Sequence, residues 1–185
     1  MPVREWRPEL PSGNLYSVVL HWTAGDYATT YPAYHFCLSG AADVHVVASG
    51  DLRANMRDLR ARGAAGYAAH TAGRNSFAAG IAICAMEGAT PHDFGPCPLT
   101  AAQIEALCFV AAAVARFYRI SLAAVRTHAE AAIDDGYFGA GDDERWDIAR
   151  LAPSTGPLRV AEAAAVGDEL RARIGVCNAA AAKLA

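Results

Sequence analysis

Residues 17–25 read SVVLHWTAG, an apolar run that ends on His21 and is followed by a turn. A run of β-branched and apolar residues predicts a buried strand, and the Thr-Ala-Gly after it predicts the turn. His21 therefore stands at the mouth of the strand, where the strand fixes the imidazole and the turn opens it to solvent. A lone histidine in such a place is more often a hydrogen-bonded core residue than a metal ligand, so His21 alone decides nothing.

A second histidine and a carboxylate add to this first signal. His128 closes another short apolar run at residues 122–127, and Asp147 follows nineteen residues later in Arg145-Trp146-Asp147. Two histidines and a carboxylate from separate loops are typical of a catalytic zinc site that keeps one position open.

Hydrophobic patterning predicts the other elements. Further strands are expected at residues 34–38, 44–47 and 80–85, the second as an antiparallel partner of the first. Thr100 and Gln103 have capping-box spacing before a helix that ends near Arg119. Residues 131–146 are expected to form an acidic loop, and a last amphipathic helix is expected at about 160–174. Strands interspersed with packing helices predict an α/β fold with a mixed central β-sheet flanked by helices.

Length and composition narrow the class of protein. The chain has 185 residues, of which 54% are hydrophobic, and a net charge of −3. We expect one domain at 1–185, with a core at about 15–152, and a monomer. No basic stripe points to nucleic acid, and the Ala-rich stretch 106–115 is too short to insert in a membrane. Residues 1–6 lack an apolar core of signal-peptide length, so we expect cytoplasmic synthesis without a cleavable signal peptide.

Six motifs follow one another in an order that resembles the type 2 N-acetylmuramoyl-L-alanine amidases. This family includes phage amidase-type lysozymes, bacterial cell-wall amidases and animal peptidoglycan-recognition proteins. The motifs are VVLHWTAG (18–25), AYHF (33–36), AHTAGRN (69–75), AGIAI (79–83), THAE (127–130) and RWDI (145–148). No single motif is specific, but six in this order are, and they cover about residues 15 to 152.

The resemblance implies an amidase-like or peptidoglycan-recognition-protein-like fold. It also implies zinc-dependent hydrolysis of the amide between N-acetylmuramic acid and L-alanine in peptidoglycan. The chain would be an endolysin or a bacterial cell-wall lytic amidase that acts on the wall after release or export. A module that binds muropeptides without cutting them is the alternative, and a different zinc hydrolase is a third hypothesis. The absence of His-Glu-x-x-His argues against the common metalloprotease class.

By the same resemblance, Zn²⁺ is held by His21, His128 and Asp147. The gap between the last two ligands is much shorter in phage relatives, so this chain must carry an insertion there. Asp134 and Asp135 lie inside that insertion and compete for the third position. We favour Asp147, because Arg-Trp-Asp matches the pattern that ends the family's site.

The resemblance also assigns two catalytic groups. Tyr34 corresponds to the tyrosine of the family's Tyr-His-Phe motif, and its phenol can orient the zinc water or donate to the oxyanion. Arg145 stands where bacterial and phage relatives carry a lysine. A guanidinium can stabilise an oxyanion but cannot donate a proton, so the general acid stays unassigned. Ala82 replaces the glutamate of the recycling amidases, which makes the chain more similar to the tyrosine-assisted phage type.

Four residues are predicted to bind substrate. His70 matches a histidine beside the cleft in phage relatives, where it either contacts substrate or packs. Asn75 belongs to the same motif and is expected to support that loop. Tyr137 and Phe138 lie in the insertion and offer apolar surface for one wall of the cleft. The alternative is that the insertion is a solvated acidic connection between two ligands.

Overall fold

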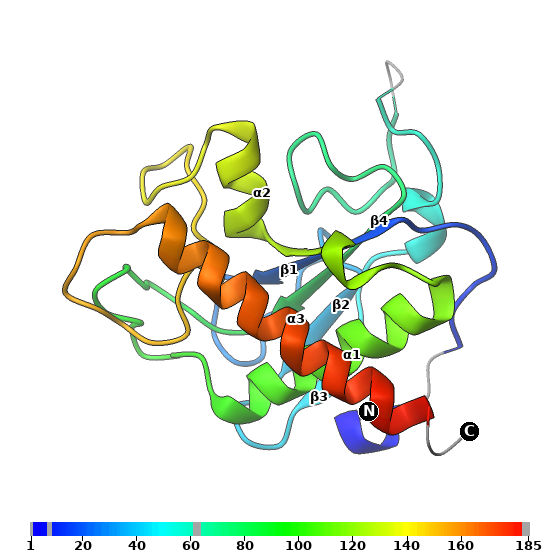
Figure 1. Ribbon diagram of the computed structural model, residues 1–185, viewed down its shortest axis with the longest axis horizontal. Coiled ribbons are helices and arrows are strands. Elements are labelled where there is room, and N and C mark those ends of the chain that lie inside the picture. The colour runs from blue at the N-terminus through cyan, green and yellow to red at the C-terminus, as the bar shows by residue number, and fades with distance from the viewer. Residues whose placement is uncertain (1, 7–8, 61–63, 183–185) are drawn as a thin grey trace.

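A five-stranded sheet forms the centre of the computed structural model, which describes residues 2–6, 9–60 and 64–182 (Figure 1). Its strands are β1 (Ser17–Trp22), β2 (Phe36–Ser39), β3 (His45–Ala48), β4 (Ala78–Ile83) and β5 (Val125–Thr127), in the order β3-β2-β4-β1-β5. β1 lies parallel to β4 and β5, and β2 lies parallel to β4 but antiparallel to β3. The predicted α/β class with a mixed central sheet is confirmed.

In the part of the chain that the structure describes, three α-helices and three 3-10 helices accompany the sheet. They are α1 (Ala101–Tyr118), α2 (His128–Asp135), α3 (Val160–Ala182), η1 (Val3–Glu5), η2 (Leu52–Asn55) and η3 (Leu122–Ala124). α1 crosses one face of the sheet and packs against α3, while α2 sits at the end of β5 and also contacts α3 (Figure 1). α1 begins with the predicted capping box of Thr100 and Gln103 and ends before Arg119.

The length of α1 bears on our expectation about membranes. The apolar helix covers 18 residues, Ala101–Tyr118, and not only residues 106–115. By length and composition alone it could therefore cross a membrane. In this fold 56% of it is buried inside the protein, and the core helix of a folded domain passes the same test.

Two expectations about helices were wrong. Residues 131–135 are not part of a loop, because α2 begins at His128 and continues to Asp135. Thr127 and Glu130 form a capping box at its start, with the same spacing that predicted α1. The last helix continues past residue 174 to Ala182, because the alanines at its end have a high helix propensity.

The alternation of β1 and β4 gives the sheet two different faces. Val18 and Leu20 join the hydrophobic core beneath α1, so His21 points to the opposite face. His21 pairs with Ala82 of β4, and Gly80 lies on the same face two residues earlier. A Cβ atom on Gly80 would lie only 2.5 Å from Cγ of His70. Small residues on this face of β4 therefore leave room for imidazole rings.

Parallel pairing brings two predicted ligands to one edge of the sheet. His21 is near the end of β1, and His128 follows directly after the neighbouring strand β5. The carboxyl ends of parallel strands meet at one edge, where ligands bind in open α/β sheets.

Candidate metal centre

The side chains of His21, His128 and Asp147 meet at this edge. His21 Nδ1 lies 3.1 Å from His128 Nδ1 and 3.4 Å from Asp147 Oδ2, and the last two atoms are 3.2 Å apart. The three residues are 0%, 6% and 4% exposed. Across residues 2–6, 9–60 and 64–182, they are the one group of three His, Cys, Asp or Glu side chains close enough to hold a metal ion.

His21 is fixed by β1 on one side and by a hydroxyl on the other. Its Nε2 lies 3.3 Å from Oγ1 of Thr71, and that oxygen lies 2.9 Å from Nδ1 of His70. Burial lowers the pKa of His21 to about 4, so the ring is neutral at pH 7. A neutral imidazole is the form that binds a metal.

His128 is fixed by the start of α2. The capping box of Thr127 and Glu130 holds the first turn, and Arg171 of α3 binds both carboxylate oxygens of Glu130 at 2.8 and 2.9 Å. The Nε2 atom of His128 lies 3.3 Å from the hydroxyl oxygen of Tyr137. The ring is therefore contacted on both nitrogens, by the triad at Nδ1 and by a phenol at Nε2.

Asp147 is placed by the loop that follows α2. Trp146 packs edge-on against Trp22 at 5.1 Å, and the Asp147 carbonyl accepts a bond of 3.0 Å from the amide of Ala129. Ile148 has a φ of 59°, a left-handed conformation that costs on the order of 1–3 kcal/mol for a residue of this kind. Burial opposes ionisation of Asp147, but hydrogen bonds with His128 and His21 hold its pKa well below the usual value.

This donor set fits a zinc ion. Ligand atoms of a tetrahedral zinc, at about 2.0–2.1 Å from the metal, lie roughly 3.3 Å from one another. The three separations of 3.1, 3.2 and 3.4 Å bracket that value. Two imidazole nitrogens and a carboxylate oxygen are also ligand types that zinc binds.

The two competing carboxylates lie elsewhere. Asp134 accepts a bond of 2.9 Å from Arg126, and Asp135 accepts hydrogen bonds from Nε and Nη2 of Arg74. Both are exposed at the end of α2, where they balance arginine charges. The structure therefore brings Asp147, and neither of these residues, to the two histidines.

A cleft of about 790 Å³ opens above the triad. Tyr34 lines it, with its ring centroid 5.0 Å from that of His21 and its hydroxyl donating to the Trp22 carbonyl at 3.4 Å. Burial raises the pKa of Tyr34, so its hydroxyl keeps its proton at neutral pH. Arg145 lines the rim, is exposed, and donates to the carbonyls of Asp142 and Glu144 at 3.0 and 2.6 Å.

The four predicted substrate-binding residues have different positions. His70, Asn75 and Tyr137 line the cleft, but His70 is only 5% exposed. The Asn75 side-chain oxygen accepts a bond of 2.9 Å from the amide of Thr71, which supports the loop. Phe138 does not line the cleft, because its side chain packs against the hydrophobic core.

Thr71 is a site residue to which the sequence analysis assigned no role. It lies inside the AHTAGRN motif that drew attention to its neighbours, yet its hydroxyl is the group that contacts His21. A hydroxyl directly after a motif histidine was the available signal. Its use depends on the contact with β1, which the sequence alone does not give.

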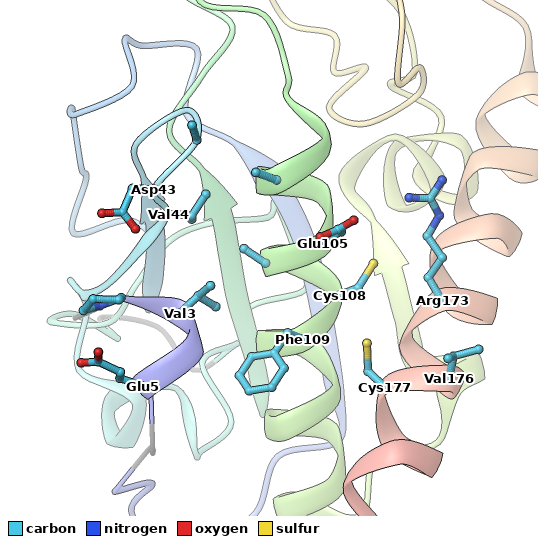
Figure 2. A pocket seen from close by; sticks show the side chains of 14 residues that line it. Val3, Glu5, Asp43, Val44, Glu105, Cys108, Phe109, Arg173, Val176 and Cys177 are labelled. Atoms are coloured by element: carbon cyan, nitrogen blue, oxygen red, sulfur yellow. The ribbon is translucent and has the colours of Figure 1, made fainter.

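A second hollow lies away from the triad (Figure 2). This groove, of about 1060 Å³, is formed by η1, the β2–β3 turn, α1 and α3. Figure 2 shows Phe109 of α1 and Val176 of α3 along it, with Cys108 and Cys177 between the two helices. The groove is larger than the cleft, but none of the three triad residues lines it.

Comparison with known protein families identifies one that matches most of the chain. The family described as N-acetylmuramoyl-L-alanine amidase matches residues 12–145, well over half of the chain. His21 and His128 lie inside the match, and Asp147 lies two residues beyond it. No curated protein matches the chain closely enough to count as a relative.

Among solved structures, one that is similar to part of the chain is an amidase complex. It is the complex of the N-acetylmuramyl-L-alanine amidase AmiD from E. coli with the substrate anhydro-N-acetylmuramic acid-L-Ala-D-gamma-Glu-L-Lys. The match covers 68% of this chain at 16% identity, with a TM-score of 0.43. The chain spans about half of that structure, since 52% of it is covered.

Proposed function

Since this chain belongs to the N-acetylmuramoyl-L-alanine amidase family, we propose that it hydrolyses the amide between N-acetylmuramic acid and L-alanine in peptidoglycan with one bound zinc ion. The observation that carries the proposal is the meeting of His21 Nδ1, His128 Nδ1 and Asp147 Oδ2, all within 3.4 Å, at an open cleft. Three protein ligands with an open side are typical of catalytic rather than structural zinc.

The three ligands prepare a site for a cation. His21 and His128 contribute nitrogen donors and Asp147 contributes one negative charge, so the site occupied by Zn²⁺ would keep a net positive charge. Zinc bound there would supply a Lewis acid that makes water available as hydroxide near pH 7 and polarises a carbonyl. The burial of the ligands keeps bulk water from competing for their lone pairs.

Tyr34 is the best-placed hydrogen-bond donor beside the triad. Its phenol keeps its proton at neutral pH, and its present bond to the Trp22 carbonyl is long at 3.4 Å. Such a weakly held hydroxyl can turn to donate to the oxyanion that develops on the scissile carbonyl. We propose this oxyanion contact as the role of Tyr34.

Arg145 contributes charge at the rim of the cleft. Its guanidinium is exposed and bonded to two carbonyls of its own loop, so it is held beside the opening rather than over the triad. It attracts the anionic transition state through space, because a guanidinium stabilises negative charge but does not act as a general acid. We propose that Arg145 acts only electrostatically.

The biological setting follows from the proposed reaction. An enzyme that cuts this bond acts on the cell wall, so we propose an endolysin or a bacterial lytic amidase that reaches the wall after cytoplasmic synthesis and release or export. Ala82 at the position of the recycling amidases' glutamate supports the tyrosine-assisted phage type. Substrate contacts are proposed for Tyr137, His70 and Asn75, which line the cleft.

Product analysis tests the reaction. Purified peptidoglycan is incubated with the zinc-loaded protein, and new amino groups and new reducing sugar ends are both measured. We expect L-alanine amino groups to appear without reducing ends. Reducing ends would indicate a glycosidase, and binding to peptidoglycan without any release would favour the non-catalytic muropeptide-binding alternative.

A further inference from the structure

The two histidines of the triad share one arrangement. Each presents Nδ1 to the other ligands, and each presents Nε2 to a side-chain hydroxyl. For His21 the hydroxyl is that of Thr71, and for His128 it is that of Tyr137, in each case at 3.3 Å. The hydroxyls come from two different loops, one before β4 and one after α2.

This arrangement matters because a neutral imidazole carries one proton on one of two nitrogens. A histidine can bind a metal through Nδ1 only when the proton is on Nε2. A hydroxyl oxygen next to Nε2 stabilises that form by accepting the proton's hydrogen bond. Without an acceptor there, the proton on Nε2 would be left without a partner in a buried place, which costs free energy.

We propose that Thr71 and Tyr137 are positioning residues that hold His21 and His128 in the form with Nδ1 free for zinc. The inference rests on the proposed zinc-dependent function. It concerns residues that do not touch the metal themselves and act through the ring of a ligand.

Thr71 carries a hydroxyl that lies between two imidazole rings. The residue is 2% exposed. Its Oγ1 atom lies 3.3 Å from Nε2 of His21 and 2.9 Å from Nδ1 of His70. A hydroxyl that accepts from one ring is free to donate its own proton to the other. In the proposed arrangement Thr71 donates its own proton to Nδ1 of His70, and Gly80 provides the space that the His70 ring needs.

The loop that carries Tyr137 is linked to the loop that carries Thr71. Arg74, three residues after Thr71, forms a paired hydrogen bond with Asp135, two residues before Tyr137. Arg74 also lies 3.4 Å from Asp134, so ion pairs of this one arginine join the Thr71 loop to the end of α2, from which the Tyr137 loop begins. Asn75 adds a bond of 2.9 Å to the Thr71 amide, which limits movement of that loop.

The test measures zinc affinity rather than turnover. Wild-type protein and the variants Thr71→Val, Thr71→Ser and Tyr137→Phe compete for zinc with a chromogenic chelator of known affinity. Tyr118→Phe is the matched control, because it also removes a hydrogen-bonded phenol, one that donates to the Pro11 carbonyl at 2.7 Å. The absorption spectrum of the cobalt(II)-substituted protein reports the ligand environment, and thermal melting reports folding.

Loss of the outer partner of a metal-binding histidine typically weakens metal affinity by about 10–100-fold. We expect that loss for Thr71→Val and Tyr137→Phe, with an altered cobalt spectrum. Thr71→Ser and Tyr118→Phe should bind zinc within a few-fold of wild type.

Wild-type affinity in both Thr71→Val and Tyr137→Phe would overturn this inference while the proposed zinc site stands. A variant that melts earlier but binds zinc normally counts as the same negative result. Weak binding by Thr71→Ser as well would also contradict a role for the hydroxyl. Failure of the wild-type protein itself to bind zinc would overturn the proposed function and this inference together.

Discussion

The cleft and the groove are two hollows with different chemistry, and the groove is the larger of the two. The groove, at about 1060 Å³, is lined by apolar side chains such as Phe109 and Val176 and by charged residues, none of them a member of the triad: Glu5, Asp43, Glu105 and Arg173. The cleft, at about 790 Å³, lies at the ends of parallel strands, where His21 and His128 converge with Asp147. The difference shows that convergent polar groups, and not volume, identify a candidate site.

The backbone draws the same contrast. Ile148 and Ala24, which have φ values of 59° and 54°, stand at the cleft, one beside Asp147 and one on the cleft wall. The groove walls are mostly the regular helices α1 and α3. Left-handed backbone at a β-branched residue is rare and is often found at functional sites. The cleft therefore carries strain that the groove does not need.

The largest effect is expected from the histidines. His21→Ala and His128→Ala should each lose bound zinc and at least ~10³-fold in turnover, since zinc contributes several kcal/mol of transition-state stabilisation. Val176→Ala and Cys177→Ser in the groove serve as matched variants and should keep both. Metal analysis and peptidoglycan hydrolysis measure the outcome. A comparable loss from the groove variants would erase the distinction between the two hollows.

The next prediction separates carboxylates within and beside the cleft. Asp147→Ala should lose zinc and activity, because it removes the one charged ligand. Asp135→Ala should keep zinc and lose at most about 1 kcal/mol of stability, since its pair with Arg74 is partly exposed. Asp134→Ala should behave in the same way. Zinc content and thermal melting are compared for the three variants, and the opposite order would mean that the third ligand is misassigned.

A smaller effect is expected from one hydroxyl. Tyr34→Phe should keep zinc but lose ~10²–10³ in kcat, which is typical of one oxyanion donor. Tyr27→Phe is the control, because its hydroxyl donates to the Pro98 carbonyl at 2.8 Å and does not line the cleft. Steady-state kinetics on peptidoglycan fragments give the comparison. Equal kcat for Tyr34→Phe and wild type would reduce Tyr34 to a packing role.

The smallest effect is expected at the exposed rim. Arg145→Ala should lower kcat/KM by about tenfold or less, because a charge acting through water contributes about 1 kcal/mol at 4 Å. Arg145→Lys should keep most of the activity, and the loss in Arg145→Ala should shrink as salt is raised. Equal losses in both variants, independent of salt, would argue against an electrostatic role.

Some of the fold could be predicted from local patterns. The apolar run before His21 gave β1, and the capping box of Thr100 and Gln103 gave the start of α1. α2 was missed although Thr127 and Glu130 show the same spacing, because the acidic and glycine-rich residues after them indicated a loop. At this position the capping box predicts the helix better than the composition of the residues that follow it.

Some residues of the candidate site could be predicted from the sequence, and others could not. Residues at strand ends could be named in advance, because parallel strands bring their carboxyl ends together. Thr71 could not, since its contact with His21 joins two loops far apart in the sequence. Tyr137 and Phe138 were both predicted to form a wall of the cleft, but only Tyr137 lines it. Phe138 packs against the core, and its backbone pairs with that of Arg145. Backbone pairing within the insertion, which the sequence does not show, separates them.

The central claim is that one zinc ion, held by His21, His128 and Asp147, is required for hydrolysis of peptidoglycan. The most direct measurement titrates zinc into chelator-treated protein while release of L-alanine amino groups is followed. We predict no release without metal and a recovery that saturates at about one zinc per chain, as one three-ligand site requires. His21→Ala should not recover at the same zinc concentrations. Full activity in the metal-free protein, or equal recovery by His21→Ala, would contradict the claim.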